Sequence, residues 1–461
     1  MKDLHFVGIG GIGMSALAAA AAARNWRVSG SDRGADRPEN APIFRALKSR
    51  GIAVWPQDGS RFAAPPLPEA LVYSTAIEAD NPDFLAAGDL PRLHRSELLR
   101  MLLESSGRTT VAVTGSCGKS TVTCYLAETL AQLGRDPEMI AGALDKRFRA
   151  PDNAGNYRAG RGDVLVFEAD ESDKSLLHYG ADYALILNIG TDHYDKAELA
   201  RVFGEFLGGV RRGAVLSAEV FSAVREHVPS GLPVRVIDGG NPADSLAGYL
   251  PGGTAVFGDG ARLKLPSPGR HMAENALFIR ALAGMLGEDD AATLAALTDF
   301  SGVWRRNDFA GRTARGARVF DDYAHNPEKI VSCLAGMRER CAGRIFAVFQ
   351  PHGYGPFGFM REPLFTALEA ALRPGDEFVL LEPFYAGGTS SFSPHASDVA
   401  AEYAGKSAFP ERYRFFPDRE FLRARLTSVP GADDLIVIMG ARDNSLSDFA
   451  ASLTTQSSVV K

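Results

Sequence analysis

The sequence predicts an α/β protein of three domains, each built around a mostly parallel sheet. Short apolar runs alternate with longer helical patterns, which is typical of strand–helix–strand units. The alternation starts afresh at Thr109 and again near Ala317. The chain has 461 residues, more than one hydrophobic core usually supports. We therefore expect domains over residues 1–107, 108–312 and 313–461.

Each domain has its own predicted strands. The first begins with LHFVGIG (4–10), followed by an alanine-rich helix from Met14 to Arg24, and its later strands cover residues 26–32 and 71–76. In the second, the strand TTVAVTG leads into a helix that ends at Gly134, since glycine commonly terminates helices, and further strands cover residues 163–170 and 183–190. In the third, strands are expected at residues 317–325, 344–352, 376–384 and 434–443.

The composition excludes several classes of protein. Fifty basic and 56 acidic side chains leave a net charge of −6, which argues against non-specific binding to nucleic acid. No apolar run reaches the length that spans a membrane. The four cysteines form no CxxC pair, so neither a zinc site nor a disulfide framework is expected. We expect a cytoplasmic protein, a monomer or a homodimer.

GIGGIGMS (8–15) predicts a diphosphate-binding loop. It fits Gly-x-Gly-x-x-Gly, follows a strand and opens a helix, and Asp32 lies at the tip of the next strand. Glycines allow the backbone to approach a diphosphate, and the helix N-terminus offers free N–H groups. The context indicates a Rossmann-like domain and, taken alone, favours NAD. A tight turn without a ligand is the alternative.

TGSCGKST (114–121) predicts a second phosphate loop, between a strand and a helix. Val113 occupies the first glycine position of the full Gly-x4-Gly-Lys-Ser pattern. The loop keeps backbone N–H groups that can hold phosphate, with Lys119 to reach the outer phosphates and Ser120 to bind Mg²⁺. Cys117 is unusual here, and is either an oxidisable thiol at a helix N-terminus or simply a small side chain. We favour the second interpretation.

Hard metal ligands are predicted at two strand ends beside this loop. Glu168 closes one strand within the acidic run EADESD, and the next strand is followed by Thr191, Asp192 and His193. The carboxyl ends of parallel strands meet at one edge of the sheet. Glu168 and His193 are therefore expected to converge on a metal at Ser120.

Several motifs together resemble the Mur ligase family, almost from end to end. They are FVGIGGIGMSALA (6–18), VSGSD (28–32), STAIEADNP (74–82), LHRSELL (93–99), TGSCGKST (114–121), FEADESD (167–173), NIGTDH (188–193), PGRHMAEN (268–275), FSGVWRR (300–306), DDYAHNP (321–327), FQPH (349–352) and MGARD (439–443). Motifs in this order are far more specific than any single one. The resemblance implies a central P-loop ATPase domain between two Rossmann-like domains.

The resemblance also implies a substrate for each loop, and UDP-sugar replaces NAD at the first. Positions matching the family's UDP-sugar contacts are Gly10, Gly11, Ile12, Gly13, Met14, Ser15, Asp32, Ser74 and Thr75. Those matching its ATP contacts are Gly115, Ser116, Cys117, Gly118, Lys119, Ser120, Thr121, His271, Asn275, Arg306 and Asp322. Lys119, Glu168 and His193 would be catalytic, with magnesium at Ser120, Glu168 and His193.

The implied activity is ATP-dependent amide-bond formation in peptidoglycan precursor synthesis. ATP would convert the carboxylate of UDP-N-acetylmuramate to an acyl phosphate, which an amino acid would attack. L-alanine or a variant acceptor is expected. The last domain would close over the nucleotide and hold the acceptor, with His325, His352 and Arg361 as candidate residues.

Departures from the family fall at the phosphate loop and at the acceptor pocket. The family usually has histidine at Cys117, and threonine at Ser120 and Val122; it also has an acid at Gly190 and asparagine at Met272. After FQPH, Gly353 and Pro356 stand where arginines are common, and arginine forks are natural clamps for a carboxylate. We expect a different way of holding the acceptor, with Arg361 or the loop of residues 382–397 contributing.

Three other functions stay open. The chain could bind nucleotides without catalysis, act as a dehydrogenase, or attach a different amine or a whole peptide to the same UDP-sugar. The second phosphate loop argues against a dehydrogenase, and Lys119, Glu168 and His193 argue against a purely binding role.

Overall fold

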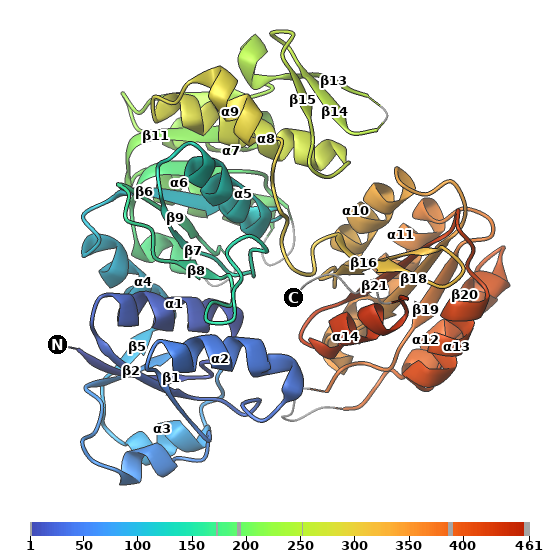
Figure 1. Ribbon diagram of the computed structural model, residues 1–461, viewed down its shortest axis with the longest axis horizontal. Helices are drawn as coiled ribbons and strands as arrows, with labels where there is room; N and C mark the ends of the chain where they lie inside the picture. Colours follow the sequence, from blue (N-terminus) through green and yellow to red (C-terminus); the bar gives the residue numbers. More distant parts are fainter. Residues whose placement is uncertain (1, 172–173, 191–194, 251, 386–390, 456–461) are drawn as a thin grey trace. The chain divides into compact units, whose positions relative to one another are not determined.

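The computed structural model describes residues 2–171, 174–190, 195–250, 252–385 and 391–455. The chain forms two compact units, Met1–Trp304 and Arg305–Lys461, whose elements are labelled in Figure 1. In the described parts of the chain, no helix is long and apolar enough to cross a membrane. The predicted α/β class with mostly parallel sheets is confirmed.

The first unit opens with a parallel sheet of spatial order β3-β2-β1-β4-β5. Its strands are β1 (Asp3–Val7), β2 (Arg27–Ser31), β3 (Ala53–Trp55), β4 (Ala70–Tyr73) and β5 (Arg92–His94), and its helices are α1 (Ile12–Ala23), α2 (Ala41–Ser49), α3 (Pro82–Ala87) and α4 (Arg95–Glu104). The order places β1 in the middle, so the loop that follows β1 lies at the carboxyl edge of the sheet between the two halves.

The second sheet of this unit has the order β12-β11-β10-β6-β9-β7-β8 and is parallel except for the pair β7–β8. Its strands are β6 (Thr109–Thr114), β7 (Glu138–Ile140), β8 (Tyr157–Arg158), β9 (Val164–Glu168), β10 (Ala181–Ile186), β11 (Val210–Ser217) and β12 (Val234–Ile237). The helices are α5 (Lys119–Gln132), α6 (Lys196–Leu207), α7 (Ala218–Val224), α8 (Arg270–Met285) and α9 (Asp290–Ala296).

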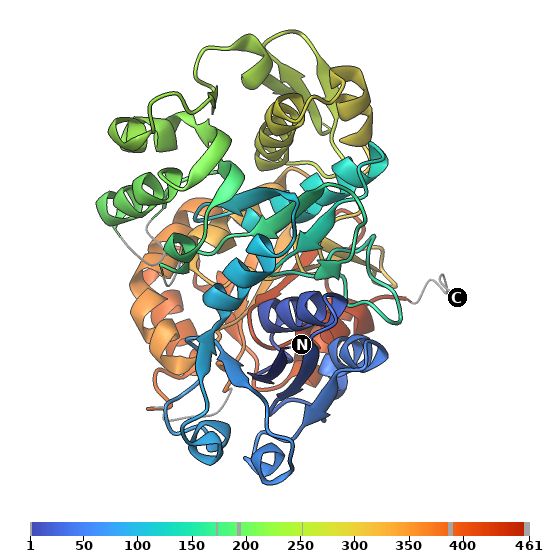
Figure 2. The ribbon, with the colours of Figure 1, turned by 90° about the vertical axis from the view of Figure 1, so that its left-hand side faces the viewer.

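Both faces of the second sheet are covered, which explains its nearly continuous apolar strands. Along β6, Val111 and Val113 pack with α5 and α8, whereas Ala112 packs with the cluster that includes α6 and α7. A small antiparallel sheet also packs on α8, and Figure 2 shows it at the top of the view. The sequence analysis did not predict its strands β13 (Leu246–Leu250), β14 (Thr254–Phe257) and β15 (Arg262–Lys264).

The second unit contains a sheet of order β16-β17-β21-β18-β19-β20, parallel except at β16. Its strands are β16 (Asp308–Arg312), β17 (Arg318–Asp322), β18 (Ile345–Gln350), β19 (Glu377–Leu380), β20 (Tyr413–Phe415) and β21 (Leu435–Gly440). α10 (Pro327–Arg338), α11 (Tyr354–Ala371) and α12 (Ala396–Lys406) pack on one face, and α13 (Arg419–Ser428) and α14 (Ser445–Ser452) on the other.

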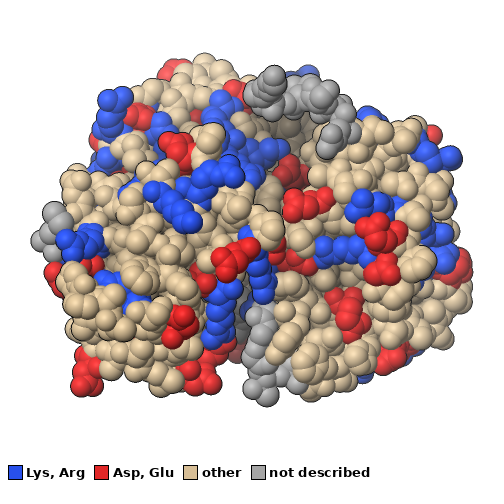
Figure 3. All heavy atoms as spheres, turned by 60° about the horizontal axis from the view of Figure 1, so that its bottom comes forward, with Lys and Arg blue, Asp and Glu red and all other residues tan. Residues whose placement is uncertain are grey.

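Short 3-10 helices complete the described secondary structure. They are η1 (Pro38–Asn40), η2 (Ser60–Ala63), η3 (Ser175–His178), η4 (Arg225–His227), η5 (Pro242–Asp244) and η6 (Pro410–Arg412). Figure 3 shows both acidic and basic side chains on one face of the molecule.

The predicted strands form, but the predicted start of the last domain at residue 313 falls after β16. The boundary between the compact units lies instead between Trp304 and Arg305. β16 is a short antiparallel edge strand with the sequence DFAGR, so it lacks the apolar run that marks the buried strands. The division into three domains stays a prediction.

A buried pair of carboxyl groups links α5 to the segment that precedes the second unit. Glu128 and Asp145 both have 0% exposure. Glu128 accepts hydrogen bonds from Arg147 Nε (2.5 Å) and from the backbone N–H of Ser301 (3.1 Å). Burial, together with the smaller effect of the neighbouring charge of Glu128, raises the pKa of Asp145 to about 8. Asp145 therefore stays protonated in the folded protein at neutral pH.

Asp145→Asn is expected to become progressively less destabilising, or more stabilising, as pH rises from 4 to 8. The unfolded carboxyl ionises near its ordinary pKa of 3.8, but the folded one ionises only near 8. The free energy of unfolding of the wild type therefore falls, relative to that of the asparagine variant, by up to about 1.4 kcal/mol per pH unit across this window. Thermal melts at several pH values test this, with the exposed Asp152→Asn as control. A difference between variant and wild type that is the same at every pH would contradict it.

Candidate active site

The first glycine loop leaves β1 at the carboxyl edge of its sheet and is organised by Asp32. The Asp32 carboxylate accepts hydrogen bonds from the N–H of Gly10 (2.8 Å) and of Gly34 (2.7 Å). A Cβ on Gly10 would lie 2.6 Å from Phe44 Cζ and 2.8 Å from Asp32 Oδ2, so only glycine fits there. Asp32 thus holds the loop through its carboxylate.

A cavity of about 360 Å³ opens beside Asp32 at the ends of β2 and β3. Phe44, Lys48 and Trp55 are among the residues that line it. Aromatic rings with a nearby cation suit a base and a phosphate, and the sequence analysis did not single out these residues. Trp55 is the last residue of β3, and this position at the carboxyl edge of the sheet is the sequence feature that could have identified it as a site residue.

The other predicted residues of this site divide into two groups. Met14 and Ser15 are buried in the first turns of α1, and the Ser15 hydroxyl donates to the carbonyls of Gly11 (2.9 Å) and Ile12 (3.0 Å). Ser74 and Thr75 follow β4 at the same edge of the sheet. The loop therefore presents mainly backbone N–H groups, while the Ser15 hydroxyl bonds within the loop.

The second phosphate loop connects β6 to α5 and is held by Asn188. Gly115 (φ 131°) and Gly118 (φ 88°) adopt backbone conformations that favour glycine. The Asn188 side chain accepts from the N–H of Cys117 (2.8 Å) and donates to the Cys117 carbonyl (2.9 Å). The Ser116 hydroxyl accepts from the N–H of Gly190 (2.8 Å). Asn188 was missed as a site residue, although it begins the quoted motif NIGTDH.

Cys117 takes part in this loop through its backbone, and its side chain is half-buried. The two hydrogen bonds to Asn188 involve its N–H and carbonyl groups, which any residue could provide. Thr121 lies in the first turn of α5 and is half-buried. These backbone contacts agree with the interpretation of Cys117 as simply a small side chain in the loop.

Lys119 forms a buried ion pair with Glu171 from the acidic run. Its Nζ lies 2.8 Å from Glu171 Oε2 and donates to the Gly115 carbonyl at 2.9 Å. The side chains are 15% and 3% exposed. Burial by itself would lower the pKa of Lys119, but Glu171, Asp170 and Glu168 together raise it. Lys119 therefore stays cationic and is held over the loop.

Ser120 and Glu168 provide adjacent oxygen atoms at the start of α5. The Ser120 hydroxyl donates to Glu168 Oε1 at 3.0 Å, and Glu168 Oε2 accepts from the N–H of Gly142 at 2.8 Å. Hydroxyl and carboxylate oxygens are the donors that Mg²⁺ prefers, so this pair fits one side of a magnesium site. His193, together with Thr191 and Asp192, lies outside the described residues.

Helix α8 brings the predicted adenine-side residues toward this loop. A Cβ on Gly118 would lie 3.6 Å from Asn275 Oδ1, so Asn275 lies next to the loop. Met272 on the same helix is buried, and its sulfur lies 3.9 Å from Asn275 Nδ2. His271 lies in the first turn of α8, with its ring close to Gly269.

In the second unit, the predicted residues gather at the carboxyl edge of the sheet. The Arg306 guanidinium lies over the Tyr323 ring, 5.3 Å from its centre. Asp322 accepts from the N–H groups of Asn307 (2.7 Å) and Ala324 (2.8 Å), and burial raises its pKa. Arg305, which precedes Arg306 in the chain, is buried. It donates hydrogen bonds to Asp321 (3.1 Å) and to the carbonyls of Gly440 and Asp443. The sequence pattern did not distinguish the two arginines.

His325 and His352 lie together at this edge, with ring centres 5.1 Å apart. His325 Nδ1 donates to the Tyr323 carbonyl at 2.9 Å, so Nε2 carries the lone pair. Burial, together with the smaller effect of the positive charge of Lys329, lowers the pKa of His325 to about 3. His325 is therefore neutral at physiological pH and can accept a hydrogen bond.

Arg361, a candidate acceptor-binding residue, forms an ion pair with Glu402. Its Nε lies 3.4 Å from Glu402 Oε2 on α12. In the loop of residues 382–397, Glu382 accepts hydrogen bonds from Tyr354, His395 and the N–H of Ala396, and residues 386–390 lie outside the described ones. Glu382 thus joins this loop to α11 and α12.

Three family models match the chain in order. They are the Mur ligase family catalytic domain at residues 3–106, the Mur ligase middle domain at 113–211 and the Mur ligase glutamate ligase domain at 305–442. Together they cover most of the chain, including both phosphate loops and the last sheet.

Relatives match over nearly the whole length. The UDP-N-acetylmuramate–L-alanine ligase of Rhizobium meliloti (strain 1021) is 33% identical over 98% of this chain and 96% of its own. That of Rubrobacter xylanophilus is 33% identical over 95% and 97%. The crystal structure of UDP-N-acetylmuramate-alanine ligase from Thermotoga maritima has a TM-score of 0.78 at 26% identity, covering 98% of both chains. A murein peptide ligase from Psychrobacter arcticus, at 20% identity and a TM-score of 0.69, shares the fold.

Proposed function

Because this chain belongs to the Mur ligase family, we propose that it is an ATP-dependent, ADP-forming ligase that joins an amino acid to the carboxylate of UDP-N-acetylmuramate. This places it in peptidoglycan precursor synthesis. The observation that carries the proposal is the second phosphate loop, where Lys119 is held cationic by Glu171 and Ser120 bonds Glu168. A cation beside the loop and metal-binding oxygen atoms next to it favour phosphoryl transfer over nucleotide binding without catalysis.

The first half-reaction transfers the γ-phosphoryl group of ATP to the substrate carboxylate, giving an acyl phosphate and ADP. Backbone N–H groups of the loop hold the phosphates, except that of Cys117, which donates to Asn188, and Lys119 neutralises charge on the outer phosphates. Magnesium, when bound by Ser120, Glu168 and His193, would neutralise the remaining phosphate charge. Asn188 keeps the loop in the conformation that makes these contacts.

In the second half-reaction, the amine attacks the acyl carbon and phosphate leaves. The attack forms a C–N bond and breaks the C–O bond to phosphate, and the amine loses a proton. Lys119 can stabilise the oxyanion that forms. We assign the acceptor to the edge of the last sheet, near His325 and His352. His325 is neutral there, so it can accept a hydrogen bond from the incoming ammonium or amine.

The way the acceptor is bound is a separate proposal. The ion pair of Arg361 with Glu402 supports a site that does not clamp the acceptor carboxylate through the usual arginines, since Gly353 and Pro356 cannot provide them. The acceptor is then L-alanine held differently, another amino acid, a peptide, or an amine without that carboxylate.

A screen of amine acceptors tests both proposals. Release of ADP and phosphate should require a UDP-sugar and an amine together, and product mass identifies the amine. Normal affinity and turnover with L-alanine would overturn the proposed departure in acceptor binding but not the ligase activity. Binding of UDP-N-acetylmuramate with no turnover for any amine would instead indicate a protein that binds nucleotides without catalysis.

Cys117→Ala is expected to keep at least about half of wild-type kcat, since the two hydrogen bonds of Cys117 with Asn188 use backbone atoms, which alanine also provides. Steady-state kinetics with saturating ATP and UDP-sugar measure this. Loss of nearly all activity in a variant with an unchanged melting temperature would assign a direct role to the thiol.

A further inference from the structure

Asn156 directly precedes a strand of the second sheet of the first unit, yet its side chain reaches the first glycine loop. It lies between Gly155 and β8, and its carbonyl accepts from the N–H of Ala141 at 2.9 Å, just after β7. A Cβ on Gly155 would lie 2.4 Å from the Asp145 carbonyl oxygen, so the backbone just before Asn156 packs closely against that of Asp145. The backbone of Asn156 is therefore anchored to the sheet that carries the second phosphate loop.

The Asn156 side-chain amide bonds the first turn of α1. It is only 3% exposed, and its Nδ2 donates to the Ile12 carbonyl (2.7 Å) and to Ser15 Oγ (2.8 Å). A carbonyl can only accept, so the amide must present its NH₂ group here, and both hydrogens are used. Ser15 Oγ in turn donates toward the carbonyls of Gly11 and Ile12. Asn156 thus completes the hydrogen bonding of the Ser15 hydroxyl.

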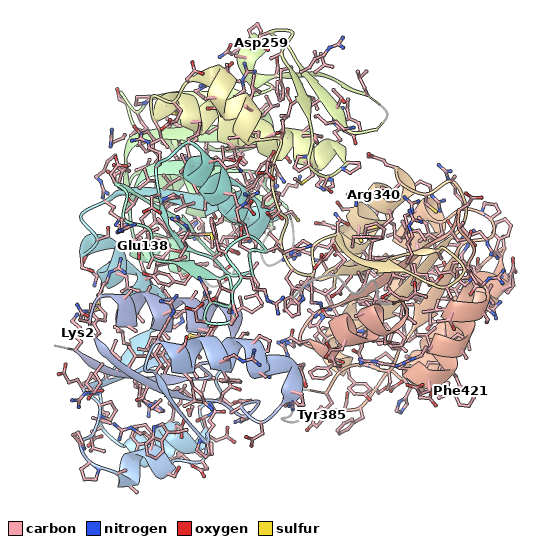
Figure 4. All side chains as sticks on the ribbon, viewed as in Figure 1. Lys2, Glu138, Asp259, Arg340, Tyr385 and Phe421 are labelled. Atoms are coloured by element: carbon pink, nitrogen blue, oxygen red, sulfur yellow. The ribbon has the colours of Figure 1, made fainter. Side chains whose placement is uncertain are left out.

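A second contact fixes the opposite end of the same helix. Arg24, which follows α1, forms an ion pair of 2.8 Å with Glu138 on β7, and the side chains are 14% and 4% exposed. Figure 4 labels Glu138, which is the first residue of β7. α1 is therefore tied to the second sheet at both ends, but only the Asn156 contact lies at the glycine loop.

We propose that Asn156 is a positioning residue for the diphosphate of the UDP-sugar, acting through Ile12 and Ser15. The inference rests on the proposed function, in which the first glycine loop binds that diphosphate. A loop that binds through backbone N–H groups depends on their direction. By holding the first turn of α1, Asn156 sets that direction from the ATP-binding sheet.

Asn156→Asp tests this with almost no change in side-chain volume. It removes both donors and places a carboxylate against two oxygen atoms. We expect the KM for UDP-N-acetylmuramate, and its Kd measured by calorimetry without ATP, to rise at least about tenfold. The KM for ATP should stay within about twofold, because the second phosphate loop keeps its contacts. Asn156→Ala, which also lacks the donors but adds no charge, serves if the aspartate variant does not fold.

Two controls separate positioning from general stability. Asn153→Asp, in the same loop, keeps the oxygen that accepts from Gly155 N–H (3.0 Å) and should behave as wild type. Glu138→Gln removes the distant ion pair and should lower the melting temperature without separating the two KM values. Equal increases in both KM values for the Asn156 variants, or no increase, would overturn the proposal. If the wild type itself binds no UDP-sugar, the proposed function falls as well.

Discussion

Lys119→Met is expected to lower kcat by at least about a thousandfold, the largest effect of any single substitution considered for this protein. Lys119 is the cation at the second phosphate loop, and Glu171 and the Gly115 carbonyl hold its Nζ in place. Methionine has similar length but no charge, so charge on the transferred phosphoryl group would go unneutralised. Pre-steady-state formation of ADP measures this step directly.

The variant also leaves Glu171 buried without its partner. That loss is expected to destabilise the fold, so melting temperatures must accompany the kinetics. Lys119→Met with Glu171→Gln removes the unpaired charge and should recover stability without recovering activity. Lys406→Met, an exposed lysine of the second unit, is the matched control and should leave kcat unchanged. A Lys119 variant that is fully active would exclude this loop as the site of phosphoryl transfer.

Glu168→Gln is expected to lower kcat about a hundredfold or more, with the loss depending on magnesium. Glutamine keeps the size of the side chain and an oxygen that can accept from Gly142 or Ser120, but it removes the negative charge that attracts a divalent cation. The magnesium concentration for half-maximal activity should rise. Excess magnesium should restore part of the activity.

Measuring the affinity for ADP distinguishes whether Glu168 acts as a metal ligand or only as a structural carboxylate. The affinity for ADP should fall in the variant when magnesium is present and stay near wild type in EDTA. Glu219→Gln, which affects an exposed ion pair with Lys196, is the control. Equal loss of ADP affinity with and without magnesium would contradict the assignment and indicate that Glu168 mainly shapes the loop through Ser120 and Gly142.

Much of the fold was predictable because its signals are local. The apolar runs that become β1, β6, β9, β10 and β21 lie where the strands form. Glycines at positions 10, 115 and 118 have backbone conformations or close contacts that exclude a side chain. Other strands were missed. They are the edge strand β16 and the small sheet of β13–β15, which are short and antiparallel and carry little apolar pattern, and also β3, β5, β7, β8, β11, β12 and β20.

The sequence by itself determined the α/β class, the family and the two glycine-rich loops between a strand and a helix, and it predicted Lys119, Ser120 and Glu168 as candidate catalytic or metal-binding residues. These follow from residue types at fixed spacing along one strand, turn and helix. Only the tertiary structure decided which side chains support them: Glu171 beside Lys119, Asn188 across the second loop, and Asn156 beneath the first. Asn156 lies 144 residues from Ile12 along the chain. No spacing rule connects such residues, because the packing of separate elements brings them within hydrogen-bond distance.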